Sequence, residues 1–172
     1  ADAQVLDVEA DGEAEEEEHH QRHADAHAQR VGVAGDVMGF LAGDGRGAAL
    51  PWNQEIPDPV TKLSWNSWVE LSHNKAAELG VTFGDVVTIA TEAGSVDVSV
   101  FPRGGIPDDV VAIPIGQGHT VGHYASMAGD ELSQPGVARG VNLADILPAA
   151  MDEAGGQAFL STKATVTKTG RF

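Results

Sequence analysis

The stretch DVVTIATEAGSVDVSV, residues 85–100, carries the clearest secondary-structure signal in the chain. Val96, Val98 and Val100 alternate with polar residues, which is the period of a strand with one buried face. An apolar run at 85–91 comes before them, and a Glu-Ala-Gly turn separates the two segments. The sequence therefore predicts a β-hairpin at this point, and with it a fold built largely from strands.

Outward from this hairpin, the chain reads as short strands with two short helices. Ser72 and Gly80 have the residue types of a helix N-cap and a left-handed C-terminal residue, and Asn142 is a second N-cap. Three prolines predict an ordered loop over 42–59. The predicted strands are 31–41, 65–71, 85–91, 96–100, 110–115 and 159–168, and the predicted helices are 73–79 and 142–147. Short strands with few helices favour a small barrel over a doubly wound sheet.

The chain length and the net charge exclude several classes of function. A chain of 172 residues suits one domain. The net charge of −16 argues against a nucleic-acid partner and against adsorption to anionic lipid. No apolar run is long enough to predict direct membrane insertion. The absence of cysteine excludes disulfides, thiolate metal sites and a cysteine nucleophile within this chain.

The charge is unevenly distributed. Residues 1–30 hold 10 of the 26 acidic side chains and 2 of the 10 basic ones, with few large apolar residues. This composition predicts an acidic arm that is disordered or loosely helical, ahead of a folded domain at 31–172. Its histidines could hold a divalent metal weakly, but a solvated polar tract is the preferred interpretation. The remaining acidic excess is also typical of salt-adapted proteins.

A glycine-rich loop follows the predicted strand at 110–115. Its backbone N–H groups and the side chains of His119, Thr120 and His123 could donate to an anion. The glycine spacing is wrong for a dinucleotide fingerprint, and no βαβ repeat follows. His119 and His123 are four residues apart but lack a third ligand, so no metal site is predicted. Ser126, His123 and Asp130 lack a nucleophile elbow, so no catalytic residue is predicted either.

The three tryptophans divide into two groups. Trp65 and Trp68 are expected in the core or at an interface, which is the usual location of large aromatic side chains. Trp52 lies in the proline-containing loop and is the better candidate for contact with a partner or ligand.

Several blocks in order resemble the C-terminal barrel of molybdopterin oxidoreductases. They are DGRG at 44–47, PWNQEIPDP at 51–59, VELS at 69–72, AAELGV at 76–81, FGDVV at 83–87, VAIPIGQGH at 111–119 and GVNL at 140–143. The resemblance runs from about Gly35 to Gly170. Trp52, the segment at 54–60 and the GQGHT sequence at 116–120 most resemble the large iron–sulfur subunit of bacterial alternative complex III, a membrane quinol oxidoreductase.

The resemblance implies a mainly β fold, a six-stranded double-psi β-barrel with two or more short helices. It also implies that the chain is a domain excised from a longer one. By position, the cofactor contacts would be the glycine-loop residues and two later polar residues: Gly116, Gln117, Gly118, His119, Thr120, Gly122, His123, Asn142 and Asp152. Only Arg103 and Arg139 lie near these loops in the sequence, so few basic side chains are available to bind a pyrophosphate.

Two functions follow from the resemblance. The preferred one is a cofactor-free, structural barrel in a respiratory membrane oxidoreductase like alternative complex III, with no activity of its own. Its partners would be other domains of the parent chain and subunits of the complex, on the periplasmic side of the membrane, a cytoplasmic location being the alternative. The second is a genuine domain for molybdopterin guanine dinucleotide in a molybdenum or tungsten oxidoreductase. A third idea, self-cleavage at Gly94-Ser95 as in a related decarboxylase, is weaker, because Gly-Ser is ordinary turn chemistry.

Overall fold

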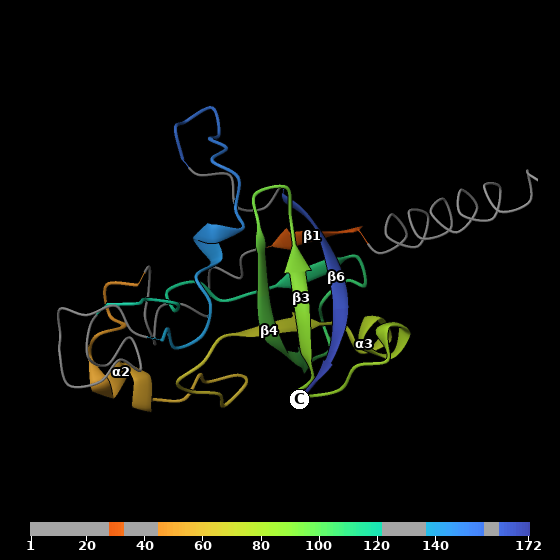
Figure 1. Cartoon of the computed structure of the whole chain (residues 1–172), viewed down its shortest axis with the longest axis horizontal. Coiled ribbons are helices and arrows are strands. Elements are labelled where there is room, and N and C mark those ends of the chain that lie inside the picture. Colours follow the sequence, from red (N-terminus) through yellow and green to blue (C-terminus); the bar gives the residue numbers. More distant parts are fainter. Residues whose placement is uncertain (1–27, 33–44, 122–136, 157–161) are drawn as a thin grey trace, which may run out of the picture.

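The computed structural model describes residues 28–32, 45–121, 137–156 and 162–172 of the chain. The described residues form six strands and a few short helices (Figure 1). The strands are β1 (Ala28–Gly32), β2 (Trp68–Leu71), β3 (Val86–Ala90), β4 (Ser95–Pro102), β5 (Val110–Ala112) and β6 (Thr162–Arg171). The helices are α2 (Pro51–Glu55), α3 (His73–Leu79) and the 3₁₀ turn η2 (Leu143–Asp145). The predicted mainly β fold with short helices is confirmed.

The strand pairings close into a barrel in the order β1-β5-β2-β4-β3-β6. Two pairs are parallel, β1 with β5 and β2 with β4, and both join strands that are not consecutive in the chain. The other four pairs are antiparallel. The ten-residue strand β6 pairs with β1 on one side and β3 on the other, so it closes the ring.

The hairpin predicted from residues 85–100 is present as β3 and β4. Ile89 lies opposite Val96, and the N–H of Thr91 donates to the carbonyl of Gly94 at 2.8 Å across the turn. Val87, Ile89, Val98 and Val100 are buried, as the alternation requires. With β2, β5, β6 and η2 they form one hydrophobic core inside the barrel.

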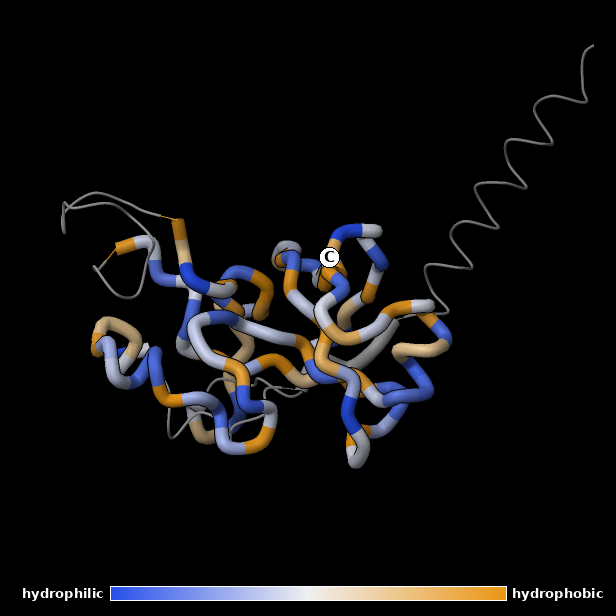
Figure 2. Tube along the Cα trace, turned by 90° about the horizontal axis from the view of Figure 1, so that it is seen from below, coloured by the Kyte–Doolittle hydropathy of each residue, from blue (hydrophilic) through white to orange (hydrophobic). Residues whose placement is uncertain are grey.

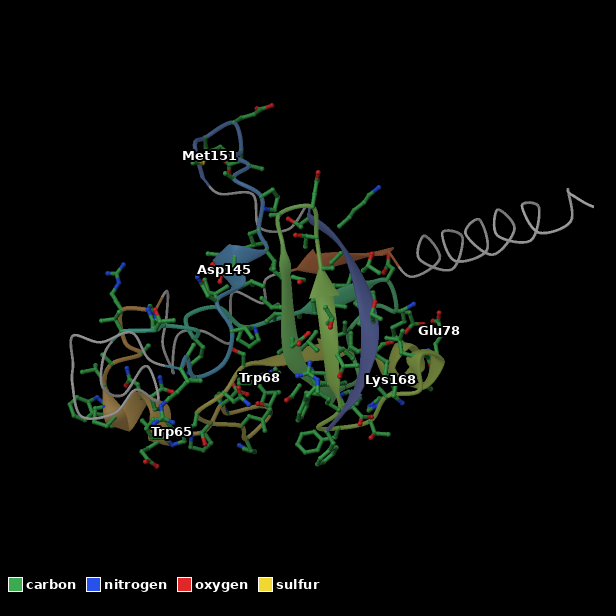
Figure 3. All side chains as sticks on the ribbon, in the orientation of Figure 1. Trp65, Trp68, Glu78, Asp145, Met151 and Lys168 are labelled. Carbon is green, nitrogen blue, oxygen red and sulfur yellow. The ribbon has the colours of Figure 1, made fainter. Side chains whose placement is uncertain are left out.

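Helix α3 follows its sequence signals. The Ser72 hydroxyl accepts from the N–H of Lys75, and Gly80 takes the left-handed conformation at φ 63°. Val81 is buried directly after it. Lys168 Nζ donates to the carbonyl of Gly80, which joins the C-terminal end of α3 to β6. Figure 3 shows Lys168 and Glu78 at this end of the barrel.

Several element boundaries differ from the predictions. Residues 51–55, predicted as loop, form α2, because Pro51 stands at the first turn, where its missing N–H costs nothing. β2 begins at Trp68 and not at residue 65, since Trp65 has φ 64°, outside the strand region. The segment after Asn142 is a single 3₁₀ turn. β5 ends at Ala112, before Pro114.

The two outer strands also differ. β1 covers 28–32, so it begins within the stretch predicted as an acidic arm, and the rest of the predicted 31–41 strand lies outside the described residues. β6 covers 162–171, three residues beyond the predicted end, because its last residues pair with β3 at a bulge. None of the helices in the described ranges is long and apolar enough to cross a membrane.

One charged residue is buried in the barrel wall. Glu70 on β2 is 2 % exposed and accepts from the Trp68 indole at 3.1 Å and from the Arg103 guanidinium at 2.8 Å. The Arg103 N–H also donates to the carbonyl of Leu71. Because both carboxylate oxygens are bonded, the cost of burying the charge is offset locally.

We expect Glu70→Ala to lower the free energy of unfolding by about 3 kcal/mol, because the indole N–H and the guanidinium lose their acceptor inside the barrel wall. Urea unfolding monitored by tryptophan fluorescence measures this change. Glu92→Ala, in the exposed turn between β3 and β4, is the control and should shift the free energy by less than about 0.5 kcal/mol. Equal midpoints for the two variants would contradict the assigned role of Glu70.

Acid should weaken the contact between β4 and β6. The Thr88 hydroxyl, at 2.6 Å, and then the Arg171 guanidinium bond the Asp97 carboxylate and hold its pKa below the ordinary value. A carboxyl whose pKa is lower in the folded state stabilises fully above its unfolded value of about 3.9 and loses that contribution as pH falls through the folded value. Wild-type stability should therefore drop below about pH 4, and Asp97→Asn should make this drop shallower.

Unfolding midpoints between about pH 5 and about pH 3 measure the effect. Asp109→Asn removes an equal charge from an exposed loop and serves as the control, because it lowers the net negative charge without touching the strands. An identical pH dependence for wild type and Asp97→Asn would show that this carboxylate contributes nothing.

Candidate functional site

Four segments from distant parts of the sequence meet beside the barrel. They are the turn and helix at 45–55, the loop 64–67, the glycine-rich loop 116–121 and the segment 139–142, and together we call them the loop cluster. Figure 1 shows α2 and the neighbouring loops set to one side of β3, β4 and β6. Most of the predicted site residues lie in this cluster, so its contacts decide what those residues can bind.

Gln117 is buried and engaged with α2. Its Nε2 donates to Gln54 Oε1 at 2.9 Å, and its Oε1 accepts from Gln54 Nε2 at 3.2 Å. The same Gln54 Nε2 also donates to the carbonyl of Ala48 at 2.9 Å. The amide of Gln117 is therefore already paired within the chain.

Gly118 packs directly against the backbone of residues 141 and 142. Its φ is 89°, and a Cβ at this position would lie 2.1 Å from the Asn142 nitrogen. Its N–H donates to the carbonyl of Arg139 at 2.8 Å. Only glycine permits this approach. The structure thus brings two parts of the predicted site, the glycine-rich loop and Asn142, into contact.

The Asn142 side chain serves its own helical turn. Its Oδ1 accepts from the N–H of Ala144 at 3.2 Å, and its Nδ2 donates to Asp145 Oδ1 at 2.9 Å. These bonds cap η2. The asparagine lies at the edge of the loop cluster, with its hydrogen-bonding groups directed to η2.

His119 and Thr120 are exposed at the end of the loop. The His119 ring stacks close to Gly45, where a Cβ would lie 2.7 Å from Nε2. Gly116 and Gly45 both have positive φ, at 101° and 107°. The loop therefore rests on the turn at 45–48.

Asp152 lies elsewhere. Its Oδ1 accepts from the N–H of Gly156 at 2.7 Å and from the N–H of Ala154 at 2.9 Å, which closes a small turn. Figure 3 shows the neighbouring Met151 far from Trp65 of the loop cluster. The described structure does not bring Asp152 to the glycine-rich loop.

Two predicted site residues, Gly122 and His123, lie outside the described residues. Within the described ranges, no group of three or more metal-ligating side chains comes together.

The structure adds an aromatic and basic pair that local patterns could not show. The Arg139 guanidinium carbon lies 4.3 Å from the ring centre of Trp65, in cation–π contact. Its Nε is buried without a hydrogen-bond partner among the described residues. Next to it, Gly140 packs on Ser67, whose Oγ accepts from the N–H of Val141 at 3.0 Å. Trp65 and Arg139 are far apart in the sequence, so only the fold pairs them.

The other predicted basic residue is engaged in the barrel wall. Arg103 binds the buried carboxylate of Glu70, so its charge is neutralised there. A further arginine, Arg46, is exposed in the turn at 45–48, next to Gly45, which contacts His119 of the glycine-rich loop. In the sequence, only the DGRG block at 44–47 indicated that Arg46 belongs to this region.

The outer side of α2 exposes apolar side chains. Trp52 is 59 % exposed, so its side chain is accessible, whereas Trp68 is buried. Leu50, Ile56 and Val60 are also exposed nearby in the sequence. Figure 2 shows that hydrophobic residues lie on peripheral loops as well as in the barrel.

Asp58 holds the loop that leads from α2 to β2. It is fully buried, and its Oδ2 accepts from the N–H groups of Val60 and Thr61 and from the Thr61 hydroxyl. Its Oδ1 has no hydrogen-bond partner among the described residues. These contacts give the loop an ordered shape, which the prolines alone only suggested.

Comparison with solved structures identifies the fold. Acetylene hydratase from Pelobacter acetylenicus, one of 46 solved chains that match, superposes with a TM-score of 0.57 at 17 % identity. The match covers 86 % of this chain and 19 % of the hydratase chain. This chain therefore spans about a fifth of that protein's length, and at this identity the likeness concerns the fold. No curated protein matches the sequence.

The family comparison covers most of the barrel. The family described as "Molydopterin dinucleotide binding domain" matches residues 54–164, which is more than half of the chain and includes the glycine-rich loop and Asn142. The chain belongs to this family of molybdopterin dinucleotide binding domains.

Proposed function

We propose that this chain is a structural, cofactor-free member of its family, serving as a barrel domain within a larger oxidoreductase. The observation that carries the proposal is that several polar groups expected to meet the dinucleotide bind other groups of the chain instead. Gln117 is paired with Gln54, the N–H of Gly118 with Arg139, and the Asn142 amide with Asp145.

Several of the described groups expected to hold a dinucleotide are already bonded within the chain. The pyrophosphate of the dinucleotide requires free N–H groups or cations close to the glycine-rich loop. The N–H of Gly118 is bonded to the carbonyl of Arg139, and Arg103 is neutralised by Glu70. The net charge of −16 makes the approach of an anion less favourable. No chemical step in this chain is therefore assigned to a molybdopterin dinucleotide.

The parent protein we propose is a respiratory membrane complex of the alternative complex III type. The supporting features are the WNQEIPDPV sequence at 52–60 and the GQGHT sequence at 116–120. The exposed Trp52 on α2 is suited to contact with another domain or subunit. In that setting the domain would lie on the periplasmic side of the membrane, and the redox centres would lie in other parts of the complex.

We also propose the double-psi connectivity that the family resemblance implies. Its support is the pair of parallel contacts, β1 with β5 and β2 with β4, between strands that are not consecutive. A simple up-and-down meander would contain antiparallel neighbours only.

One observation favours the second candidate, a retained site for molybdopterin guanine dinucleotide. The buried Nε of Arg139 has no acceptor among the described residues, and the backbone carbonyl of the same residue accepts from the N–H of Gly118 in the glycine-rich loop. An acidic ligand group would satisfy it.

Analysis of the intact parent protein separates the two candidates. We expect no stoichiometric molybdenum or tungsten by elemental mass spectrometry, and no releasable pterin by fluorescence after oxidation. A molybdenum enzyme purified and treated in the same way is the control for cofactor loss. About one metal ion per chain together with pterin would overturn the cofactor-free proposal.

A further inference from the structure

We propose that Gln54 is an internal clasp, which closes the glycine-rich loop 116–121 onto α2 in place of an external ligand. The inference rests on the proposed function, because an internal partner for Gln117 is needed only where no ligand supplies one.

Both the oxygen and the NH₂ group of the Gln54 carboxamide are hydrogen-bonded. Its oxygen accepts from Gln117 at 2.9 Å, and its NH₂ group donates to Gln117 at 3.2 Å and to the carbonyl of Ala48 at 2.9 Å. No other side chain of similar size combines two donors and an acceptor in this geometry. One residue thus joins the glycine-rich loop, the turn at 45–48 and α2.

Burial prevents water from replacing either amide of the clasp. Gln54 is 2 % exposed and Gln117 is 8 % exposed, so neither amide can exchange its partner for water while the loop is closed. Removing Gln54 leaves the Gln117 amide buried without this partner, and removing Gln117 leaves the Gln54 oxygen without its donor, which costs more than the net value of the bond. Removing both costs less than the sum of the two single changes.

The clasp acts next to a backbone hydrogen bond that reports on the loop. Gly118 follows Gln117 directly, and its N–H donates to the carbonyl of Arg139 at 2.8 Å. We expect that lifting the loop from α2 also breaks this bond, because Gly118 follows Gln117 directly. The exchange rate of the Gly118 amide with solvent deuterium therefore measures how often the loop opens.

Hydrogen exchange of the full chain, without added nucleotide, tests the clasp. Gln54→Met keeps the length of the side chain and removes its hydrogen bonds, so the Gly118 amide should exchange about tenfold faster. The Val100 amide, which donates to Asp85 in the barrel at 2.8 Å, should keep its wild-type rate. Gln54→Met combined with Gln117→Met should accelerate Gly118 less than the product of the two single effects.

The neighbouring residue provides a matched control. Asn53 also lies on α2, and its Nδ2 donates to the carbonyl of Gly47 at 3.2 Å. Asn53→Ala removes a side-chain bond from the same helix without touching Gln117, so the Gly118 rate should stay within about twofold of wild type.

Three results would overturn the clasp: an unchanged Gly118 rate in Gln54→Met, an equal acceleration in Asn53→Ala, or an equal acceleration at Val100. If Gln54→Met fails to fold, Gln117→Met breaks the same pair from the loop side and is judged by the same rates. None of these results depends on metal or pterin content, so a failed clasp is distinguishable from a failed cofactor-free proposal.

Discussion

Closure of the barrel by β6 is the constraint on which the rest of the structure depends. A sheet with a free edge would leave a row of N–H and C=O groups unpaired. β6 pairs with β1 and β3 at once and places Ala164 and Val166 in the core. It also anchors α3 through Lys168 and the β3–β4 hairpin through Arg171 and Asp97. A single long strand therefore fixes the positions of elements that are separated by most of the chain.

The loop cluster depends on this barrel but follows a different principle. In the barrel, apolar burial and strand pairing provide stability, whereas in the loop cluster polar groups satisfy one another across segments. The amide pair of Gln54 and Gln117 is of this kind, as is the bond from the N–H of Gly118 to the carbonyl of Arg139. Contacts within the chain therefore fix the position of the glycine-rich loop relative to α2 and to the segment 139–142.

The sequence predicted those parts of the fold whose causes are local. The caps of α3 and the alternation in β4 depend on residues within a few positions of one another, and both were correct. The prediction of loop at 51–55 was wrong, because prolines were weighed as turn residues while Pro51 starts a helix. The left-handed backbone of Trp65, which shortens β2, has no local signal, since tryptophan is not a residue that favours positive φ.

The candidate site also contains parts that the sequence predicted and parts that it could not predict. The glycine-rich loop and Asn142 were predicted from blocks of sequence, and the fold brings them into contact. Asp152 was assigned by position alone, and the structure places it in a separate turn. The internal partners of the site could not be predicted, because Gln54 and Gln117 are 63 residues apart and nothing near either residue identifies the other.

By itself, then, the sequence determined the strand content, the capped helix, the family and the uneven charge, since each depends on neighbouring residues or on composition. Only the tertiary structure decided which strand closes the barrel, which charge is buried in its wall and which polar groups the glycine-rich loop binds. These depend on contacts between residues brought together by the whole fold, where burial makes an unpaired polar group costly and thereby selects one arrangement.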